Sequence, residues 1–522
     1  MFKASRISAF LLLSALVLPA FHLSSPAWGK TPADTLVIGV ASDPAVLDPA
    51  VSSDNFDWRV SYPAYDRLVK FKVVNGEGST EVEPMAAESW TVSEDGKTWT
   101  FKIRPGITFS DGSPLDAAAV KFSFDRLMKI AMGPAGNLEC LASTEAPDAS
   151  TVVFTLKYPF APFLQILAIN GCSIINPAVM KHEKDGDMAR GWLAENTDGS
   201  GPFTLRQWKR GERLIMEARP GYWGGEPKIK RVILRPMREA SDRRLALEKG
   251  DIDITESILM DQLPALEKNP DVAVRRYDGQ FVEYVYVNNT RPTLSDKRVR
   301  QALNYAVDFK GIIDFVLQGN GDQAISPIPK GMWGHDDKAF RYERNPEKAR
   351  ALLAEAGVKD LSLTLIYSER RAVWEQIATI LQSNFADIGV KLDLVLLSNA
   401  TLRDRMGNGD FDLCLGAWSP DFADPYMFAN LWYDSANAGM AGNRSFYSNP
   451  KVDDLLRKAA RSTNQAERVD LYKQVQDIVI DDAAYILLYQ LKAVVPMRTN
   501  VKGFVFNPML ESMYNIESMW KE

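Results

Sequence analysis

The chain has 522 residues, of which 46% are hydrophobic and 25% charged, and this composition predicts a globular protein of about two to four domains. The formal net charge of −6 argues against a nucleic-acid-binding protein, and three cysteines exclude a disulfide-dense scaffold or an iron–sulfur array. With three histidines in the whole chain, we expect no metal site and no cofactor.

The first 27 residues have the three-part pattern of a secretory signal peptide. Lys3 and Arg6 supply positive charge, residues 7–18 are apolar, and Ser25-Pro26-Ala27 provides the small residues that a signal peptidase reads. We expect cleavage after Ala27, with cleavage after Gly29 as the alternative. The apolar run is too short to span about 30 Å of hydrocarbon, which disfavours a membrane anchor. The sequence has no cysteine near the cleavage point that could carry a lipid anchor, so we expect an exported, unanchored protein.

Local patterns in the first half of the mature chain predict strands, a capped helix and a crossover. Residues 35–40 (TLVIGV) form a buried strand, and residues 98–103 alternate between apolar and polar positions as a half-buried strand does. Asp116 is placed to cap a helix with apolar positions at helical spacing. The run Gly199-Ser200-Gly201-Pro202 predicts a sharp break and a domain crossover.

The three cysteines leave two alternatives open in an oxidising compartment. Cys140 and Cys172 are near each other in sequence, and a disulfide between them leaves Cys414 unpaired. The alternative is three buried free thiols, and the sequence alone does not fix the geometry that a disulfide needs.

The second half alternates between strands and helices. Asn345-Pro346 opens a helix that Gly357 closes, and strands are expected near residues 361–365, 390–394 and 411–416, with a helix over residues 373–387 between the first two. This alternation predicts an α/β lobe. Two α/β lobes of comparable size behind an export leader suggest a binding protein that closes like a clamshell.

Known catalytic and cofactor motifs do not assemble in this sequence. Residues 319–324 match the dinucleotide-binding pattern as letters, but a helical segment precedes them and Pro327 and Pro329 follow. Walker A, HExxH and GxSxG motifs are absent from the sequence. Without a nucleophile, a base and an oxyanion hole, we expect a protein that is not an enzyme.

Four long segments resemble one known family. They are residues 87–126, with the DGxxWTF and FxDGxP elements, residues 199–253, with GSGPFTL and PGYWGG, residues 287–308, and residues 416–455, beginning GAWSPDFADPYMFANLW. In this order they resemble the family 5 extracellular solute-binding proteins, the dipeptide- and oligopeptide-binding subunits of ABC importers. The resemblance covers essentially the whole mature chain.

The resemblance implies an α/β, two-lobed periplasmic-binding-protein fold of the large (cluster C, type II) kind with an extra subdomain in lobe I. Its base subdomain would comprise residues 28–64, 199–283 and 494–522, its inserted subdomain residues 65–198, and lobe II residues 284–493. The chain would cross between the lobes near residues 281–283 and 493–495, and ligand would bind between the lobes as they close.

The resemblance also gives Asp421 a role. In peptide-binding relatives, an aspartate three residues after a tryptophan holds the ligand's α-ammonium, and Trp418-Ser419-Pro420-Asp421 places Asp421 there. A carboxylate suits an ammonium because a charge-assisted hydrogen bond is shorter and stronger than a neutral one. The alternative is a turn residue. Asp424, before a proline, is expected to be structural. Ser419, Trp418 and Phe422 flank Asp421, and the two aromatic residues are candidates for a ligand wall.

Other candidate binding residues come from separate segments. Dipeptide-binding relatives hold the ligand's carboxylate with an arginine ahead of a lobe II helix, where Arg370 and Arg371 lie. An arginine is favoured over a lysine for its bidentate fork, and the alternative is a solvated pair. Trp374 and Trp333 are further aromatic candidates, and the remaining candidates are Asn55, Tyr284 and Asn288.

The resemblance implies a monomeric periplasmic receptor that captures short peptides, or a related amine-bearing solute, and delivers them to an inner-membrane ABC permease. No nucleic acid is expected as a partner. The alternatives are a binder of a non-peptide solute such as an oligosaccharide or an opine and, from another class, a periplasmic chaperone-like binder.

Overall fold

The computed structural model describes residues 31–371, 373–440, 442–510 and 515–522. The predicted signal peptide, with its cleavage near Ala27, lies outside the described residues. Within the described ranges, the helices are all too short or too polar to cross a membrane.

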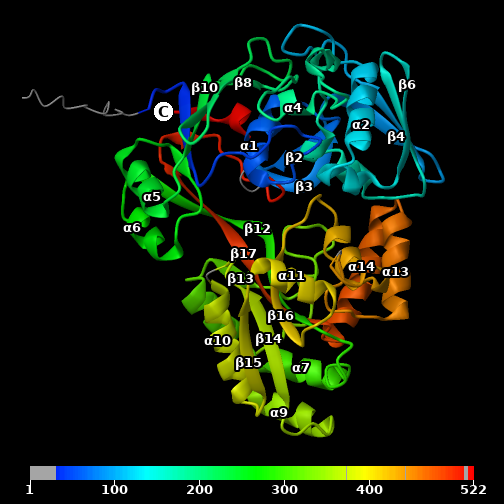
Figure 1. Cartoon of the computed structure of the whole chain (residues 1–522), viewed down its shortest axis with the longest axis vertical. Helices are drawn as coiled ribbons and strands as arrows, with labels where there is room; N and C mark the ends of the chain where they lie inside the picture. The colour runs from blue at the N-terminus through cyan, green and yellow to red at the C-terminus, as the bar shows by residue number, and fades with distance from the viewer. Residues whose placement is uncertain (1–30, 372, 441, 511–514) are drawn as a thin grey trace, which may run out of the picture.

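The chain folds into two lobes joined by a two-stranded ribbon (Figure 1). The upper lobe contains the elements before β12 together with β18 and β19, and the lower lobe contains the elements between β12 and β17. β12 (Val272–Val287) and β17 (Tyr485–Arg498) pair antiparallel through both lobes, with a register shift between Asp278 and Val282. The predicted crossings near residues 281–283 and 493–495 fall within these two strands.

The ribbon lies in the middle of an 11-stranded sheet in the described part of the chain. The sheet order is β15-β14-β16-β12-β17-β11-β1-β10-β9-β8, and β13 also pairs with β17. The upper-lobe strands are β1 (Thr35–Val40), β8 (Phe203–Lys209), β9 (Arg213–Ala218), β10 (Arg231–Pro236) and β11 (Ile254–Thr255). The lower-lobe strands are β13 (Gly321–Gln323), β14 (Ser362–Ser368), β15 (Lys391–Leu397) and β16 (Leu413–Trp418).

A second part of the upper lobe is built on the four-stranded sheet β4-β5-β7-β6. These strands are β4 (Ala87–Val92), β5 (Thr98–Ile103), β6 (Leu141–Asp148) and β7 (Thr151–Leu156), beside the hairpin β2 (Val69–Val74) and β3 (Glu77–Pro84). The predicted alternation in β5 is confirmed, since Trp99, Phe101 and Ile103 are buried. The Asp116 side chain caps α2 (Ala117–Ile130), as predicted, by accepting a hydrogen bond from the Ala119 N–H.

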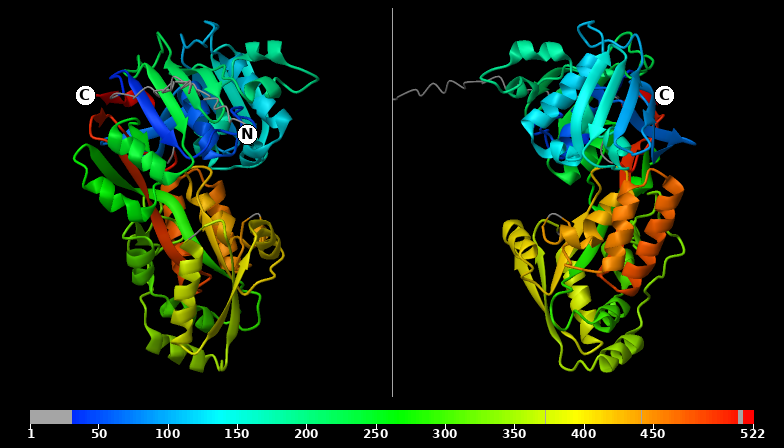
Figure 2. Two further views of the ribbon diagram at one scale, coloured as in Figure 1. Left: turned by 60° about the vertical axis from the view of Figure 1, so that its left-hand side comes forward. Right: turned by 90° about the vertical axis from the view of Figure 1, so that its right-hand side faces the viewer.

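Helices cover both lobes. In the upper lobe they are α1 (Asn55–Ala64), α3 (Phe163–Ile166), α4 (Arg190–Leu193), α5 (Ala240–Lys249) and α6 (Leu263–Glu267). In the lower lobe they are α7 (Lys297–Ala306), α8 (Phe309–Gly311), α9 (Pro346–Glu355), α10 (Val373–Ala386), α11 (Asn399–Gly407), α12 (Asn430–Tyr433), α13 (Pro450–Arg461) and α14 (Gln465–Asp481). Figure 2 shows α13 and α14 lying side by side below the upper lobe.

Short 3-10 or π turns and two C-terminal strands complete the described elements. They are η1 (Gly133–Leu138), η2 (Asn170–Cys172), η3 (Pro177–His182), η4 (Met260–Gln262), η5 (Ile312–Val316), η6 (Pro425–Met427), η7 (Ser435–Asn437), η8 (Ile516–Ser518), β18 (Val501–Lys502) and β19 (Trp520–Lys521). The predicted break at residues 199–202 lies between α4 and β8. There, a Cβ on Gly199 would come 2.2 Å from the Ala64 carbonyl oxygen, so only glycine fits.

The lobes also touch at a second place besides the ribbon. The rings of Phe160 and Tyr426 meet edge to face with centroids 5.2 Å apart. Next to them, the Ala161 N–H donates a hydrogen bond to the Ala460 carbonyl oxygen at 2.9 Å. The lower lobe therefore contacts the part of the upper lobe that carries the four-stranded sheet, through η6 and α13.

Of the two alternatives for the cysteines, the disulfide between Cys140 and Cys172 is not formed in this structure. Cys140, Cys172 and Cys414 are all free and buried, which is the alternative of three buried thiols. Burial raises the pKa of the Cys140 thiol to about 12, so this group stays protonated at neutral pH.

Candidate functional site

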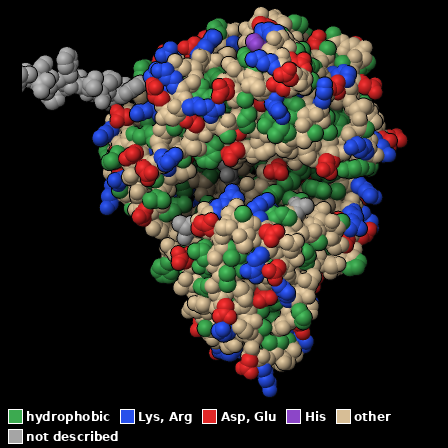
Figure 3. Space-filling model, viewed as in Figure 1, with side chains coloured by type: hydrophobic (Ala, Val, Ile, Leu, Met, Phe, Trp, Pro, Cys, Tyr) green, Lys and Arg blue, Asp and Glu red, His purple; other side chains and the backbone are tan. Residues whose placement is uncertain are grey.

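A cavity of about 280 Å³ lies beside the crossing strands, where β16 ends next to β12. It brings together six of the predicted binding residues: Asp421, Trp418, Ser419, Arg370, Arg371 and Trp374. The other lining residues are Phe281, Tyr286, Asn399, Leu402, Arg403, Met406, Leu415, Gly416, Ala417 and Arg444. Figure 3 shows the surface hollowed between the two lobes.

Asp421 is the acidic residue in the lining of this cavity. It follows β16 and is exposed, and the described residues offer its carboxylate no hydrogen bond or ion pair. The surrounding protein nevertheless removes enough water to raise the pKa of Asp421 from its ordinary value to about 6. An ammonium group placed here would supply the positive charge that the described residues do not offer to Asp421.

Asp424, three residues later, has the opposite environment. Its carboxylate is fully buried and accepts two hydrogen bonds from the Arg468 guanidinium, at 2.9 and 2.7 Å. It also caps η6 by accepting a hydrogen bond from the Tyr426 N–H. Asp424 is therefore structural, as predicted.

The raised pKa of Asp421 predicts a pH dependence of ligand binding. If a ligand ammonium pairs with the ionised carboxylate, binding lowers the pKa of Asp421 below about 6. Affinity should then be greatest near pH 7 and fall below pH 6 by about tenfold per pH unit, with proton release on binding. Above about pH 8 it should fall again, because the α-amino group of the ligand, whose ordinary pKa is about 7.7–8.0, loses its proton. Calorimetric titration of a dipeptide at pH 5.0 and 7.5, in buffers of different ionisation enthalpy, measures both effects.

The control for this pH dependence is the Asp421→Asn variant, whose affinity should not change over the same range. Glu283, behind Arg371, titrates in this range as well, since burial raises its pKa to about 7. A pH dependence that persists in Asp421→Asn would assign the effect to Glu283 and contradict the prediction.

Arg371 and Trp374 are held by Glu283 of β12. The Arg371 Nε lies 2.8 Å from Glu283 Oε1, and the Trp374 Nε1–H donates to Glu283 Oε2 at 2.7 Å. The Arg371 guanidinium also lies over the Phe281 ring, 4.5 Å from its centroid. Arg371 is therefore paired with an acidic side chain of the protein, whereas Arg370 is exposed at the cavity.

The two aromatic residues that flank Asp421 differ in their placement. Trp418 lines the cavity and packs edge to face on Trp432, with centroids 5.1 Å apart. Phe422 is 3% exposed and stacks on Tyr426 instead, outside the cavity lining. The structure therefore corrects the expectation that both residues form a ligand wall, because Phe422 belongs to the core.

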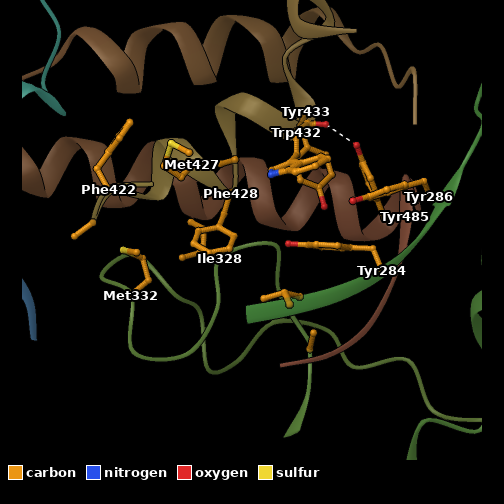
Figure 4. Close-up of a cluster of buried hydrophobic side chains, with 14 of the residues drawn as sticks. Tyr284, Tyr286, Ile328, Met332, Phe422, Met427, Phe428, Trp432, Tyr433 and Tyr485 are labelled. Atoms are coloured by element: carbon orange, nitrogen blue, oxygen red, sulfur yellow. Dashed lines mark hydrogen bonds between the residues drawn. The ribbon is translucent and has the colours of Figure 1, made fainter. Parts of the chain in front are cut away.

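Tyr284, Asn288 and Asn55 also lie outside the cavity lining. Tyr284 is 3% exposed and stacks on Trp432 in the aromatic cluster of Figure 4. Asn288 is buried, and its amide donates to the carbonyl oxygens of Gly409 and Phe411, at 2.9 and 3.0 Å. Asn55 begins α1 in the upper lobe. Tyr284 therefore packs in the core in this structure, and Asn288 provides hydrogen-bond donors for backbone carbonyl oxygens.

Arg444, Tyr286, Asn399 and Arg403 line the cavity but were not predicted. Asn399 and Arg403 belong to α11, and Arg444 lies in the irregular segment before α13. These segments are far apart in the sequence and meet only through packing, so the local pattern of the sequence does not predict that they line one cavity. Trp333, a weaker candidate, packs on Tyr472 and lies outside the cavity lining.

Comparisons with known proteins agree with this architecture. Residues 81–440 match the family model of bacterial extracellular solute-binding proteins, family 5 Middle. The "Probable D,D-dipeptide-binding periplasmic protein DdpA" of Escherichia coli (strain K12) is 48% identical over 95% of this chain and 96% of its own length.

Two solved structures show the same fold. HbpA2 from Haemophilus parasuis has a TM-score of 0.85 at 30% identity, covering 94% of this chain and 100% of its own. The periplasmic binding protein DppA from Helicobacter pylori, solved in complex with the peptide STSA, has a TM-score of 0.75 at 29% identity, covering 94% of this chain and 98% of its own. This chain therefore belongs to the family 5 bacterial extracellular solute-binding proteins and has their two-lobed α/β fold.

Proposed function

We propose that this protein is the periplasmic receptor of an ABC importer, that it captures dipeptides in the cavity beside the ribbon, and that it delivers them to an inner-membrane permease. The observation that carries the proposal is the unpaired carboxylate of Asp421 in a cavity otherwise lined by arginines and apolar or neutral groups. A free α-ammonium group complements this carboxylate. Binding without catalysis, export by a signal peptide cleaved near Ala27, and a monomeric state belong to the same proposal.

The size of the cavity supports a short ligand. Its volume of about 280 Å³ is just below the range for small-molecule sites, about 300–1,000 Å³. A long peptide would have to extend beyond it. The 48% identity to a probable D,D-dipeptide-binding protein makes D,D-dipeptides the first ligands to test.

A thermal-shift screen with calorimetric follow-up tests this proposal. The panel contains D-Ala-D-Ala, L-Ala-L-Ala, their N-acetyl derivatives, a disaccharide and an opine. We expect at least one dipeptide with a free amine to raise the unfolding midpoint, because at 100 times its Kd a ligand stabilises the folded state by about 2.7 kcal/mol. The N-acetyl derivatives should bind much more weakly. Stabilisation by the disaccharide alone, or equal binding of free and acetylated peptides, would contradict the proposal.

A further inference from the structure

The ribbon that joins the lobes is interrupted by a bulge. Asp278 of β12 pairs with Lys492 of β17. The next pair is Val282 with Gln490, so three residues of β12 lie opposite one residue of β17. A bulge of this kind leaves backbone groups outside the ladder and bends the strand. Bending between the lobes is therefore expected at residues 279–281, unless other contacts hold them.

The side chain of Gln490 holds this bulge. Gln490 is 7% exposed, and its Nε2–H donates hydrogen bonds to the carbonyl oxygens of Gly279, at 2.6 Å, and Lys330, at 2.8 Å. Its Oε1 accepts a third hydrogen bond from the Lys330 N–H at 2.9 Å. Gln280, in the bulge itself, also donates to the Lys330 carbonyl oxygen at 3.0 Å. Gln490 therefore joins the bulge to a part of the lower lobe outside the ribbon.

Lys330 belongs to a segment, residues 326–335, that we call the strut. Gln476 of α14 is fully buried and fixes both ends of the strut. It accepts a hydrogen bond from the Ser326 hydroxyl and donates one to the Gly334 carbonyl oxygen at 2.9 Å. The strut is therefore attached to the helices of the lower lobe.

The middle of the strut lies between the ribbon and the upper lobe. The Thr80 hydroxyl of β3 donates a hydrogen bond to the Gly331 carbonyl oxygen at 3.5 Å. Gly331 has a φ of +88°, and a Cβ there would lie 3.2 Å from the Gln280 Nε2, so glycine suits this turn. The strut thus contacts the ribbon and the upper lobe at its middle, while its ends are bound to the lower lobe.

We propose that the strut restrains the angle between the two lobes, and that Gln490 is the side chain that couples it to the ribbon. A bulge fastened to a fixed segment of one lobe allows a narrower range of angles than a free bulge, because hinge motion needs backbone rotation at a few residues. Without its amide, the Gly279 carbonyl oxygen and both backbone groups of Lys330 lose these hydrogen bonds. Gln490 lies outside the lining of the ligand cavity, so its replacement leaves the candidate binding residues in place.

Pulsed electron spin resonance between two labels measures the range of angles. Leu245 of α5, 43% exposed, and Ala354 of α9, also exposed, are replaced by cysteine, one in each lobe. The native cysteines are all buried, so the labels react with the introduced ones. We expect Gln490→Met to give a distribution of distances at least about twice as broad as that of the labelled parent, because methionine makes none of the three hydrogen bonds.

Two further variants locate the effect. Gln474→Met is the matched control, since Gln474 is exposed on α14 and donates only to the Asp470 carbonyl oxygen of its own helix, at 3.4 Å, among the described residues. It should keep the narrow distribution. Gln476→Met releases the ends of the strut without touching the ribbon and should broaden the distribution. Should Gln490→Met fail to fold, Gln490→Asn, whose shorter side chain stays polar, takes its place with the same expected direction.

Three outcomes would overturn the proposal. A distribution in Gln490→Met as narrow as that of the parent would show that Gln490 does not restrain the ribbon. Broadening in Gln490→Met with none in Gln476→Met would show that the strut has no part in the restraint. Equal broadening in Gln474→Met would show that the effect does not come from this contact. All of these measurements are made without ligand, so they stand or fall separately from the proposed function.

Discussion

Replacing Asp421 by asparagine is expected to weaken dipeptide binding by roughly 30- to 4,000-fold, or about 2–5 kcal/mol. The variant keeps the shape of the side chain but removes the charge that would pair with a ligand ammonium in the cavity. Because the carboxylate has no hydrogen bond or ion pair among the described residues, its loss breaks no contact within the fold. Isothermal titration at pH 7.5 measures the affinity, and the unfolding midpoint should stay the same or rise.

The contrary result is an affinity within about threefold of the wild type. That outcome would remove Asp421 from the binding site while leaving membership of the family untouched. A fall in the unfolding midpoint together with the fall in affinity would also contradict the argument, because the loss of binding would then follow from a damaged fold.

Replacing Asp424 by asparagine, the same change three residues later, is expected to lower the free energy of unfolding by about 3–5 kcal/mol. The substitution leaves the Arg468 guanidinium, whose side chain is 5% exposed, without the carboxylate that accepts two of its hydrogen bonds and balances its charge. Denaturant unfolding followed by tryptophan fluorescence measures the loss. Dipeptide affinity, measured well below the new midpoint, should change far less than in Asp421→Asn.

The double variant Asp424→Leu/Arg468→Met is the matched control for the buried pair. It removes both charges together, so it should be more stable than Asp424→Asn alone. An Asp424→Asn protein as stable as the wild type would show that Arg468 finds other acceptors or water, and would contradict the assignment of Asp424 as a structural residue.

Much of the fold follows from local signals in the sequence. The alternation over residues 98–103 predicts that Trp99 and Phe101 lie in the core, and the position of Asp116 predicts that it caps its helix. Both features could be predicted because each depends on a few neighbouring residues. The full length of β12 has no such signal. Its middle contains Arg275, Arg276 and Asp278, which interrupt the apolar pattern, and the strand continues because β17 pairs with it through both lobes.

The candidate site also contains some residues that a local sequence pattern predicts and others that only long-range packing brings to the cavity. Asp421 and Trp418 were found because they share one short segment with a recognisable spacing. Tyr284 and Tyr286 share one face of β12 and both stack on Trp432, but only Tyr286 lines the cavity, a difference that their alternation along the strand does not indicate. Arg444 belongs to an irregular segment whose place beside Trp418 depends on packing far along the chain, so its neighbours in the sequence give no hint of its position.

The contact between Phe160 and Tyr426, with the hydrogen bond from Ala161 to Ala460, has a consequence for how fast ligand enters. The Thr80 hydroxyl also donates a hydrogen bond to the Gly331 carbonyl oxygen of the lower lobe, at 3.5 Å, so the gap between the lobes widens only when both contacts break. Association then waits for a transient open form and proceeds more slowly than random collision allows. We expect dissociation to need the same event, so that these small contacts between the lobes lengthen the residence time of a bound ligand.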